Sequence, residues 1–165
     1  MEVLVFVATA AVAVVAALVV LLHRNPVIGA LFLVANLLSI AVLYLLLNAQ
    51  FLAAIQVIVY AGAIMVLILF VIMLLNLRRE SVVFGTGGTM QKSFALIASA
   101  AFLLMVARAA AGVPQRSGAL PNGFGTVEYV AQRLFGTFYY PFEAISLVLL
   151  AAMAGAIVLA KRKID

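Results

Sequence analysis

The chain has 165 residues, of which 68% are hydrophobic and 9% charged, with a mean hydropathy of +1.34 and a formal net charge of +5. Such a small polar surface excludes a water-soluble domain and predicts an integral membrane protein. Because the chain has no cysteine and a single histidine, we expect it to hold no disulfide, iron–sulfur cluster or metal site. Its basic residues gather at the ends of hydrophobic runs, which indicates membrane topology and argues against a nucleic-acid partner.

Five hydrophobic runs are each long enough to cross a bilayer, whose hydrocarbon core is about 30 Å thick. The sequence therefore predicts an all-α membrane protein with five transmembrane helices in a single membrane domain, residues 1–165. The first run follows Met1-Glu2 without a basic segment before it or a cleavage site after it, so we expect this helix to be retained. The predicted spans are residues 3–22, 27–47, 51–77, 91–111 and 142–160.

Helix-start signals mark two of these spans. Asn25-Pro26 offers a side-chain cap followed by the residue best suited to a first turn, so the second helix is predicted to begin there. Pro141 is predicted to open the fifth helix in the same way. The fourth run is flanked by Lys92 and Arg108, whose long side chains are expected to reach toward opposite interfaces.

The basic residues predict which side of the membrane each end occupies. With five spans, seven of them fall on one side and three on the other. Because cytoplasmic loops carry the excess of lysine and arginine, we predict an outer N-terminus and a cytoplasmic C-terminus. The seven are Arg24, Arg78, Arg79, Lys92, Lys161, Arg162 and Lys163, and the three are Arg108, Arg116 and Arg133.

The outer loop, residues 112–141, is rich in glycine and proline and is the stretch polar enough to stand outside the bilayer. Within it, Val127, Val130 and Leu134 follow helical spacing, with polar residues between them. We predict a short interfacial helix at residues 126–135 that lies on the outer surface.

The third run, residues 51–77, has 27 positions without a charge, interrupted by Tyr60-Ala61-Gly62-Ala63. In an α-helix, Gln56, Tyr60 and Ala63 would share one face. One interpretation is packing, in which Gly62 admits another helix closely while Gln56 and Tyr60 form hydrogen bonds across the contact. The other is a π-bulge that loosens the backbone and can shift. The residues alone are compatible with both.

Other polar residues within the spans have simpler explanations. Asn36 and Ser39 share a face of the second helix, where we expect hydrogen bonds between helices. Glu143, predicted in the first turn of the fifth helix, is expected to interact with the helix dipole, with a proton relay or a contact to a partner as the alternative. The middles of the spans contain no Asp, Glu, Lys or His, so we expect the chain to need partners for any proton transfer.

Two segments resemble the J subunit of the membrane arm of respiratory complex I, the NADH:quinone oxidoreductase subunit called chain 6 in mitochondria. The match covers residues 23–77 closely, and LFGTFYYPFEAISLVLLAAMAGAIVLA at 134–160 is similar to that family's last helix. The most specific element is VIVYAGAIMVL, residues 57–67. Residues 80–133 match in length and hydropathy alone.

The resemblance implies a five-helix subunit of the bacterial plasma (inner) membrane, between a quinone-site subunit and antiporter-like subunits. It also implies a π-bulge in the third helix near Tyr60 to Met65, whose rotation makes or breaks a water-filled proton route. Some family members have Glu where this chain has Gln56, which can relay a proton through hydrogen bonds alone. The family's carboxylate at the start of the last helix is present as Glu143. The implied coupling residues are Gln56, Tyr60, Ala61, Gly62, Ala63 and Met65, with Glu143 as a relay or a cap.

The implied function is a non-catalytic subunit that couples quinone reduction to proton movement. The resemblance also implies that this chain holds no cofactor, with FMN, iron–sulfur clusters and quinone on or near other subunits, and that the isolated chain has no activity. A purely structural scaffold subunit is one alternative. A subunit of a multisubunit cation/proton antiporter or of a membrane-bound hydrogenase is another.

Overall fold

The computed structural model describes residues 1–75, 88–112, 121 and 123–161, and within them the chain is helical. Five helical spans there are long and apolar enough to cross a membrane, which confirms the predicted spans. One of them, Gln50–Leu74, is built from three consecutive helical segments, and a short helix precedes the last span. The elements are α1 Glu2–Leu22, α2 Pro26–Leu46, α3 Gln50–Ile55, the π-helix η1 Gln56–Ile64, α4 Met65–Leu74, α5 Thr89–Ala111, α6 Val127–Phe135 and α7 Tyr139–Ala160.

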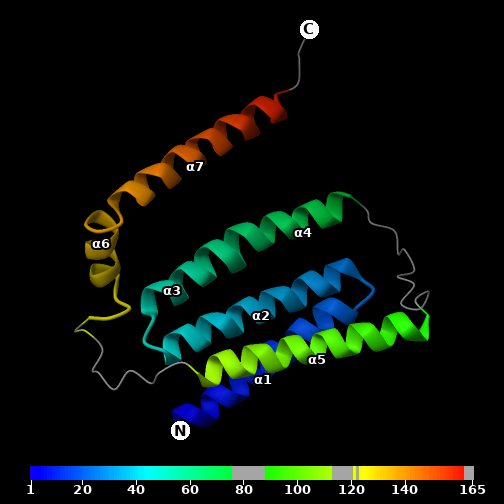
Figure 1. Cartoon of the computed structure of the whole chain (residues 1–165). Coiled ribbons are helices and arrows are strands. Elements are labelled where there is room, and N and C mark those ends of the chain that lie inside the picture. Colours follow the sequence, from blue (N-terminus) through cyan, green and yellow to red (C-terminus); the bar gives the residue numbers. More distant parts are fainter. Residues whose placement is uncertain (76–87, 113–120, 122, 162–165) are drawn as a thin grey trace.

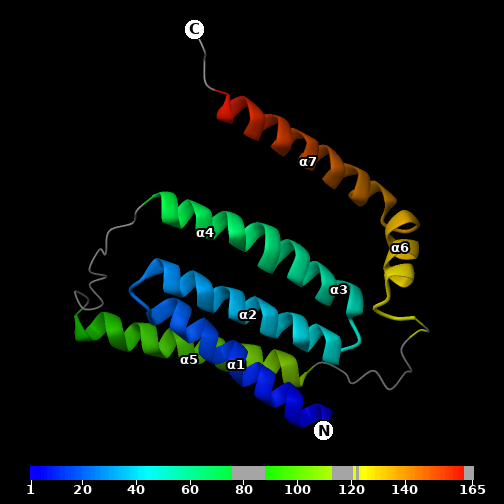
Figure 2. The same ribbon diagram turned by 180° about the vertical axis from the view of Figure 1, so that it is seen from behind.

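The spans run alternately in opposite directions (Figures 1 and 2). The turn between α1 and α2, the end of α4 and the start of α5 lie at one end of the molecule. The turn between α2 and α3, the end of α5 and α6 lie at the other end. The membrane sides of these two ends remain a prediction, and five of the ten basic residues behind it, Arg78, Arg79, Arg116, Arg162 and Lys163, lie outside the described residues.

The packed centre is a hairpin of α1 and α2 onto which the third span folds. The buried residues of this hairpin are small: Ala13 and Ala16 on α1, and Gly29, Ala30, Ser39 and Ala41 on α2. Small side chains let helix backbones approach closely, which is how helices associate in lipid without a hydrophobic driving force. The predicted start of α2 is confirmed, because the Asn25 side chain accepts a hydrogen bond of 3.0 Å from the Val27 backbone.

The helices α5 and α7 have no packing contact with any other described span. Every residue of α7, and every residue of α5 whose side chain is described, is exposed within this chain. In Figures 1 and 2, α7 stands apart from the other spans and approaches the rest of the chain through α6. Helices that are apolar all round and bare in the isolated chain must be covered by lipid or by other proteins.

The predicted short helix in the outer loop is present as α6, Val127–Phe135. Its cap is Thr126, whose hydroxyl oxygen accepts a hydrogen bond from the Tyr129 backbone at 3.3 Å. In both views α6 runs across the direction of the spans, and it contacts α3 and α7. Its position on the outer membrane surface remains a prediction.

One predicted span boundary is wrong, and another lies partly outside the described residues. The last helix begins at Tyr139, not at Pro141, which occupies its third position. Proline is tolerated there because the first N–H groups of a helix have no partner within the helix. At the other boundary, the third span is described as helical to Leu74, and residues 76 and 77 of its predicted end lie outside the described residues.

Candidate functional site

The third span changes its hydrogen-bonding pattern in the middle. Over Gln56–Ile64 the backbone is π-helical, between the α-helical segments α3 and α4. The N–H of Met65 still reaches the Tyr60 carbonyl, five residues back, which is the bonding of a π turn. Of the residues singled out in the sequence, Gln56, Tyr60, Ala61, Gly62 and Ala63 lie inside η1, and Met65 is the first residue of α4.

The π-helix places both of its ends against α2. Gln56 and Met65 are 8% and 2% exposed, and η1 and α4 both pack on α2. These residues are nine positions apart, which is two and a half turns of an α-helix with 3.6 residues per turn, and would put them on opposite faces. The wider π turns bring them to the same side. The burial of both residues against one neighbour therefore depends on the π geometry.

The face predicted from α-helical spacing is not formed. Gln56 is buried, whereas Tyr60 is 49% exposed and Ala63 is also exposed. The prediction assumed 3.6 residues per turn, and the π segment alters that period. Within this chain most side chains of η1 are exposed, Ile58 at 67% and Tyr60 at 49% among them, and are open to lipid or to another subunit.

Gly62 relieves a crowded position in the π-helix. A Cβ built on Gly62 would lie 3.2 Å from the Val57 carbonyl oxygen, five residues earlier in the same helix. No atom of another described helix lies within 4 Å of that Cβ position. The interpretation that Gly62 admits a neighbouring helix thus finds no support among the described helices of this chain. The position favours glycine because of the π backbone itself.

The polar contact between described spans is made elsewhere. Asn36 on α2 donates a hydrogen bond of 2.7 Å from Nδ2 to the carbonyl of Ala13 on α1, as the sequence predicted. The prediction for Ser39 is wrong, because its hydroxyl donates to the Ala35 carbonyl of its own helix at 2.9 Å. Neither the side-chain amide of Gln56 nor the side-chain hydroxyl of Tyr60 has a hydrogen bond to another residue in the described part of the chain.

Glu143 is not in the first turn of the last helix. Because α7 begins at Tyr139, Glu143 is its fifth residue, and the first turn contains no acidic side chain. The side chain is exposed, and α7 has no side-chain cap. Dipole interactions fall off beyond the first turn. The expected capping role is therefore wrong, and the alternative, a contact with a partner or a relay, stays a prediction.

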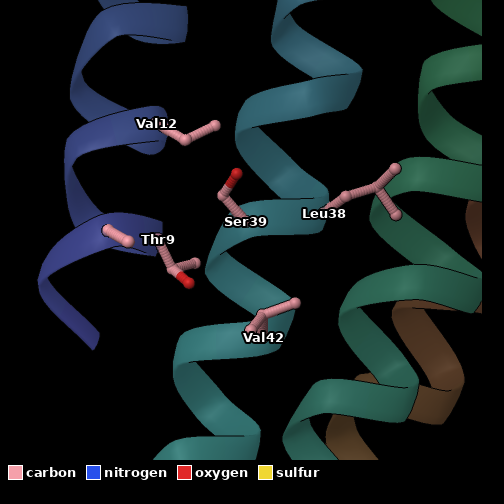
Figure 3. A pocket seen from close by; sticks show the side chains of 6 residues that line it. Thr9, Val12, Leu38, Ser39 and Val42 are labelled. Carbon is pink, nitrogen blue, oxygen red and sulfur yellow. The ribbon is translucent and has the colours of Figure 1, made fainter. Parts of the chain in front are cut away.

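A shallow hollow of about 330 Å³ opens between α1 and α2 (Figure 3). Thr9 on α1 and Ser39 on α2 give it two hydroxyl groups, and the rest of its lining is aliphatic. No titratable side chain lines it. Within the described residues there is also no group of three or more His, Cys, Asp or Glu side chains placed to hold a metal ion. The lining residues are Ala8, Thr9, Val12, Leu38, Ser39 and Val42.

One contact, at the start of the third span, is not apparent from the sequence. The turn before α6 folds onto the turn between α2 and α3, where the backbone N–H of Phe51 donates to the Gly125 carbonyl at 3.0 Å. The available signals were the break at Asn48 between two hydrophobic runs and the glycines Gly123 and Gly125. Neither signal could reveal that these distant turns meet.

Comparison with known proteins agrees with the resemblance over most of the chain. Residues 16–159 match the family model described as NADH-ubiquinone/plastoquinone oxidoreductase chain 6. The chain is 39% identical to NAD(P)H-quinone oxidoreductase chain 6 of Nostoc sp. over 148 residues, covering 89% of this chain and 73% of that protein. It is 38% identical to NADH-quinone oxidoreductase subunit J of Rhodobacter capsulatus over 158 residues, covering 93% of this chain and 78% of that protein.

A third relative extends the match to almost the whole chain. The organellar chromatophore NAD(P)H-quinone oxidoreductase subunit 6 of Paulinella chromatophora is 40% identical over 158 residues, covering 95% of this chain and 77% of that protein. The residues matched by the family model include α2, the π segment, α5 and most of the last helix, so they cover more than the two segments that carry the resemblance. The chain, with its five apolar spans, belongs to the NADH-ubiquinone/plastoquinone oxidoreductase chain 6 family.

Proposed function

We propose that the chain is a membrane subunit of NADH-quinone oxidoreductase and that its third span couples quinone reduction to proton movement. Family membership supports the first part, and favours this assembly over a cation/proton antiporter or a membrane-bound hydrogenase. The observation that carries the second part is the π-helix Gln56–Ile64, which holds Gln56 and Met65 on the same side of the span. A π segment inside an otherwise α-helical span is a frequent mark of a functional site.

The coupling step is a conversion of η1 between π-helix and α-helix. If η1 became α-helical, α4 would turn by roughly half a turn relative to α3, because nine residues then make two and a half turns. Met65 would leave the α2 face, and a different side of α4 would meet the neighbouring subunits. Small and polar side chains near Tyr60 would exchange places with bulky aliphatic ones, which opens or dries a water path.

This chain supplies the gate, and charged residues of other subunits complete the route. The middles of its spans contain no Asp, Glu, Lys or His, and Gln56 can relay a proton through hydrogen bonds alone. The chain is thus a non-catalytic part of the enzyme. Its proposed partners are the quinone-site subunit and the antiporter-like subunits. The FMN, the iron–sulfur clusters and the quinone are proposed to lie on or near other subunits of the complex.

The proposed setting is a bacterial inner membrane with the N-terminus outside and the C-terminus in the cytoplasm. The support is the seven-to-three distribution of basic residues across the two sides. In this orientation α6 and the turn between α2 and α3 face outward.

The test changes the residue that the π backbone requires to be small. Gly62→Ala places a Cβ against the Val57 carbonyl and Gly62→Val adds β-branched bulk, so both should favour the α-helical form. NADH:quinone turnover and proton uptake are measured in membranes, with a blot for assembly. We expect assembled complex with turnover, pumping or both depressed, and more so for Gly62→Val.

Gly155→Ala on α7 is the matched control, because its added Cβ meets no atom within 4 Å in the described part of this chain beyond the helix's own nearby backbone. It should retain wild-type turnover and pumping. Full activity and pumping of both Gly62 variants in assembled complex would reject the switch and leave a scaffold subunit whose third span is a packing element.

A further inference from the structure

We propose that the turn at Gly125 is a positioning element that holds α3 in a fixed orientation, so that movement of the π segment is confined to α4. The proposal rests on the function proposed above for the third span. It concerns a part of the chain far from η1 in the sequence and specifies which half of the span moves.

The turn before α6 is pressed against the turn between α2 and α3. Gly125 is buried with φ of 80°, and Asn48 opposite it has φ of 59°, so both backbones are in the left-handed region. A Cβ added at Gly125 would overlap the Asn48 carbonyl oxygen and would lie 3.0 Å from the Ala49 Cα. No side chain fits at position 125 unless the two turns separate.

The Gly125 carbonyl also acts as the cap of α3. The residue that precedes this helix, Ala49, has no side chain that can accept a hydrogen bond from the first turn. The N–H of Phe51 is one of the amide groups that a helix cannot satisfy internally, and it donates to the Gly125 carbonyl at 3.0 Å. A backbone carbonyl from a distant loop therefore replaces the usual Ser, Thr, Asn or Asp cap.

The turn that contains Gly125, residues 123–126, is itself held in place by contacts with the start of α6. The Thr126 hydroxyl donates to the Gly123 carbonyl at 2.7 Å, and its oxygen accepts from the Tyr129 backbone at 3.3 Å. The rings of Phe124 and Tyr129 pack with centroids 5.7 Å apart. Rotation of α3 would thus have to break the bond to Gly125 and displace a braced turn.

The two halves of the span, α3 and α4, differ in how many contacts fix them to the rest of the chain. The α3 side has the Gly125 bond, the buried Ala53 and the buried Gln56 just after it. In α4, Met65 is the one buried residue, and the others are exposed or partly exposed within this chain. When the helical period of η1 changes, α4 is therefore the half of the span that turns more readily.

The experiment compares side-chain directions in the assembled complex at rest and during NADH oxidation. The photo-crosslinking amino acid p-benzoylphenylalanine replaces Leu52 on α3 or Leu67 on α4, both of which are exposed. The subunit or lipid that each probe captures is identified by mass spectrometry. We expect the products of the Leu67 probe to change with turnover and those of the Leu52 probe to stay the same.

A second arm removes the tether. Gly125→Ala should make the products of the Leu52 probe depend on turnover. Gly123→Ala is the control, since Gly123 has a similar φ of 77° and its added Cβ meets only the Thr126 hydroxyl, at an ordinary 3.5 Å. It should leave the Leu52 products unchanged.

The outcomes separate the two proposals. Leu52 products that change with turnover in the wild type would overturn the fixed tether while leaving the switch in place. No change at Leu67 would reject the switch, and the positioning role with it. If the complex with Gly125→Ala fails to assemble, Thr126→Ala replaces that variant. Thr126→Ala removes the hydroxyl group that bonds to Gly123 and Tyr129, and it keeps Gly125. An unchanged Leu52 pattern in the replacement variant would count against the tether.

Discussion

The hydrogen bond between Asn36 and Ala13 should measurably stabilise the α1–α2 hairpin. It joins Nδ2 of Asn36 to the Ala13 carbonyl at 2.7 Å, beside the buried Ala16. Ala13 lies inside α1, so its carbonyl also accepts the helix's own backbone bond, and Asn36→Ala leaves no unpaired group there. We therefore expect a cost of about 0.6 kcal/mol, the average for such bonds in membranes, and at most about 1.7 kcal/mol, or roughly 3- to 20-fold in the equilibrium constant.

Two further variants fix the interpretation. Asn36→Asp should cost more than Asn36→Ala, because a carboxyl group in the middle of a span is costly in lipid and, when ionised, offers only acceptors to the Ala13 carbonyl. Ser39→Ala is the matched control on the same helix, since its hydroxyl bonds to its own helix at Ala35. Its effect should be smaller than that of Asn36→Ala, because the bond it loses lies within α2 and does not join the two helices.

The assay follows separation of the hairpin ends. The chain has no cysteine, so dyes on Val3→Cys and Leu47→Cys report energy transfer between the N-terminal end of α1 and the C-terminal end of α2. The purified chain is titrated from mild detergent into SDS, and the midpoints of the variants are compared. Equal midpoints for Asn36→Ala and Ser39→Ala would refute the reasoning.

Three further predictions concern the chain in its membrane. Reporter fusions after Leu77 and Asp165 should report cytoplasm, and a fusion at Asn122 should report the outside; all three positions lie outside the described residues. An inside signal at Asn122 would contradict the five-span topology. A complex with Glu143→Gln should assemble and keep most quinone reductase activity. Glu143 lies beyond the first turn of α7, and its side chain has no hydrogen bond to another described residue. Near-total loss of proton pumping in the assembled complex would instead make Glu143 a relay. The purified chain should have no visible absorbance band, since it has no cysteine and one histidine, and a haem or flavin spectrum would overturn that expectation.

The spans could be predicted from the sequence because the bilayer leaves few alternatives. Each backbone polar group in lipid must be satisfied within the chain, so a long apolar run has to be a helix. The start of α7 was misplaced by two residues because Pro141 was assigned to the first position, although an early helical turn accepts proline at its third position as well. That small shift moved Glu143 out of the first turn and changed its interpretation.

The site was harder to predict, for two physical reasons. The sequence indicated an irregularity near Gly62, but the shared burial of Gln56 and Met65 follows from the π period, which α-helical spacing cannot predict. The contact of Gly125 with Asn48 and Phe51 is non-local and made largely by backbone atoms. No side-chain pattern encodes such a contact.

The bare helices α5 and α7 have a consequence for the life of the protein in the cell. The chain exposes 13990 Å², whereas a compact protein of 17.5 kDa exposes roughly 7,900 Å². A copy that lacks its partners therefore presents two long unpacked helices, and the Glu143 carboxyl group on one of them, to its surroundings. We therefore expect the amount of this chain in the membrane to follow the supply of its partners, because only they or lipid can cover these helices.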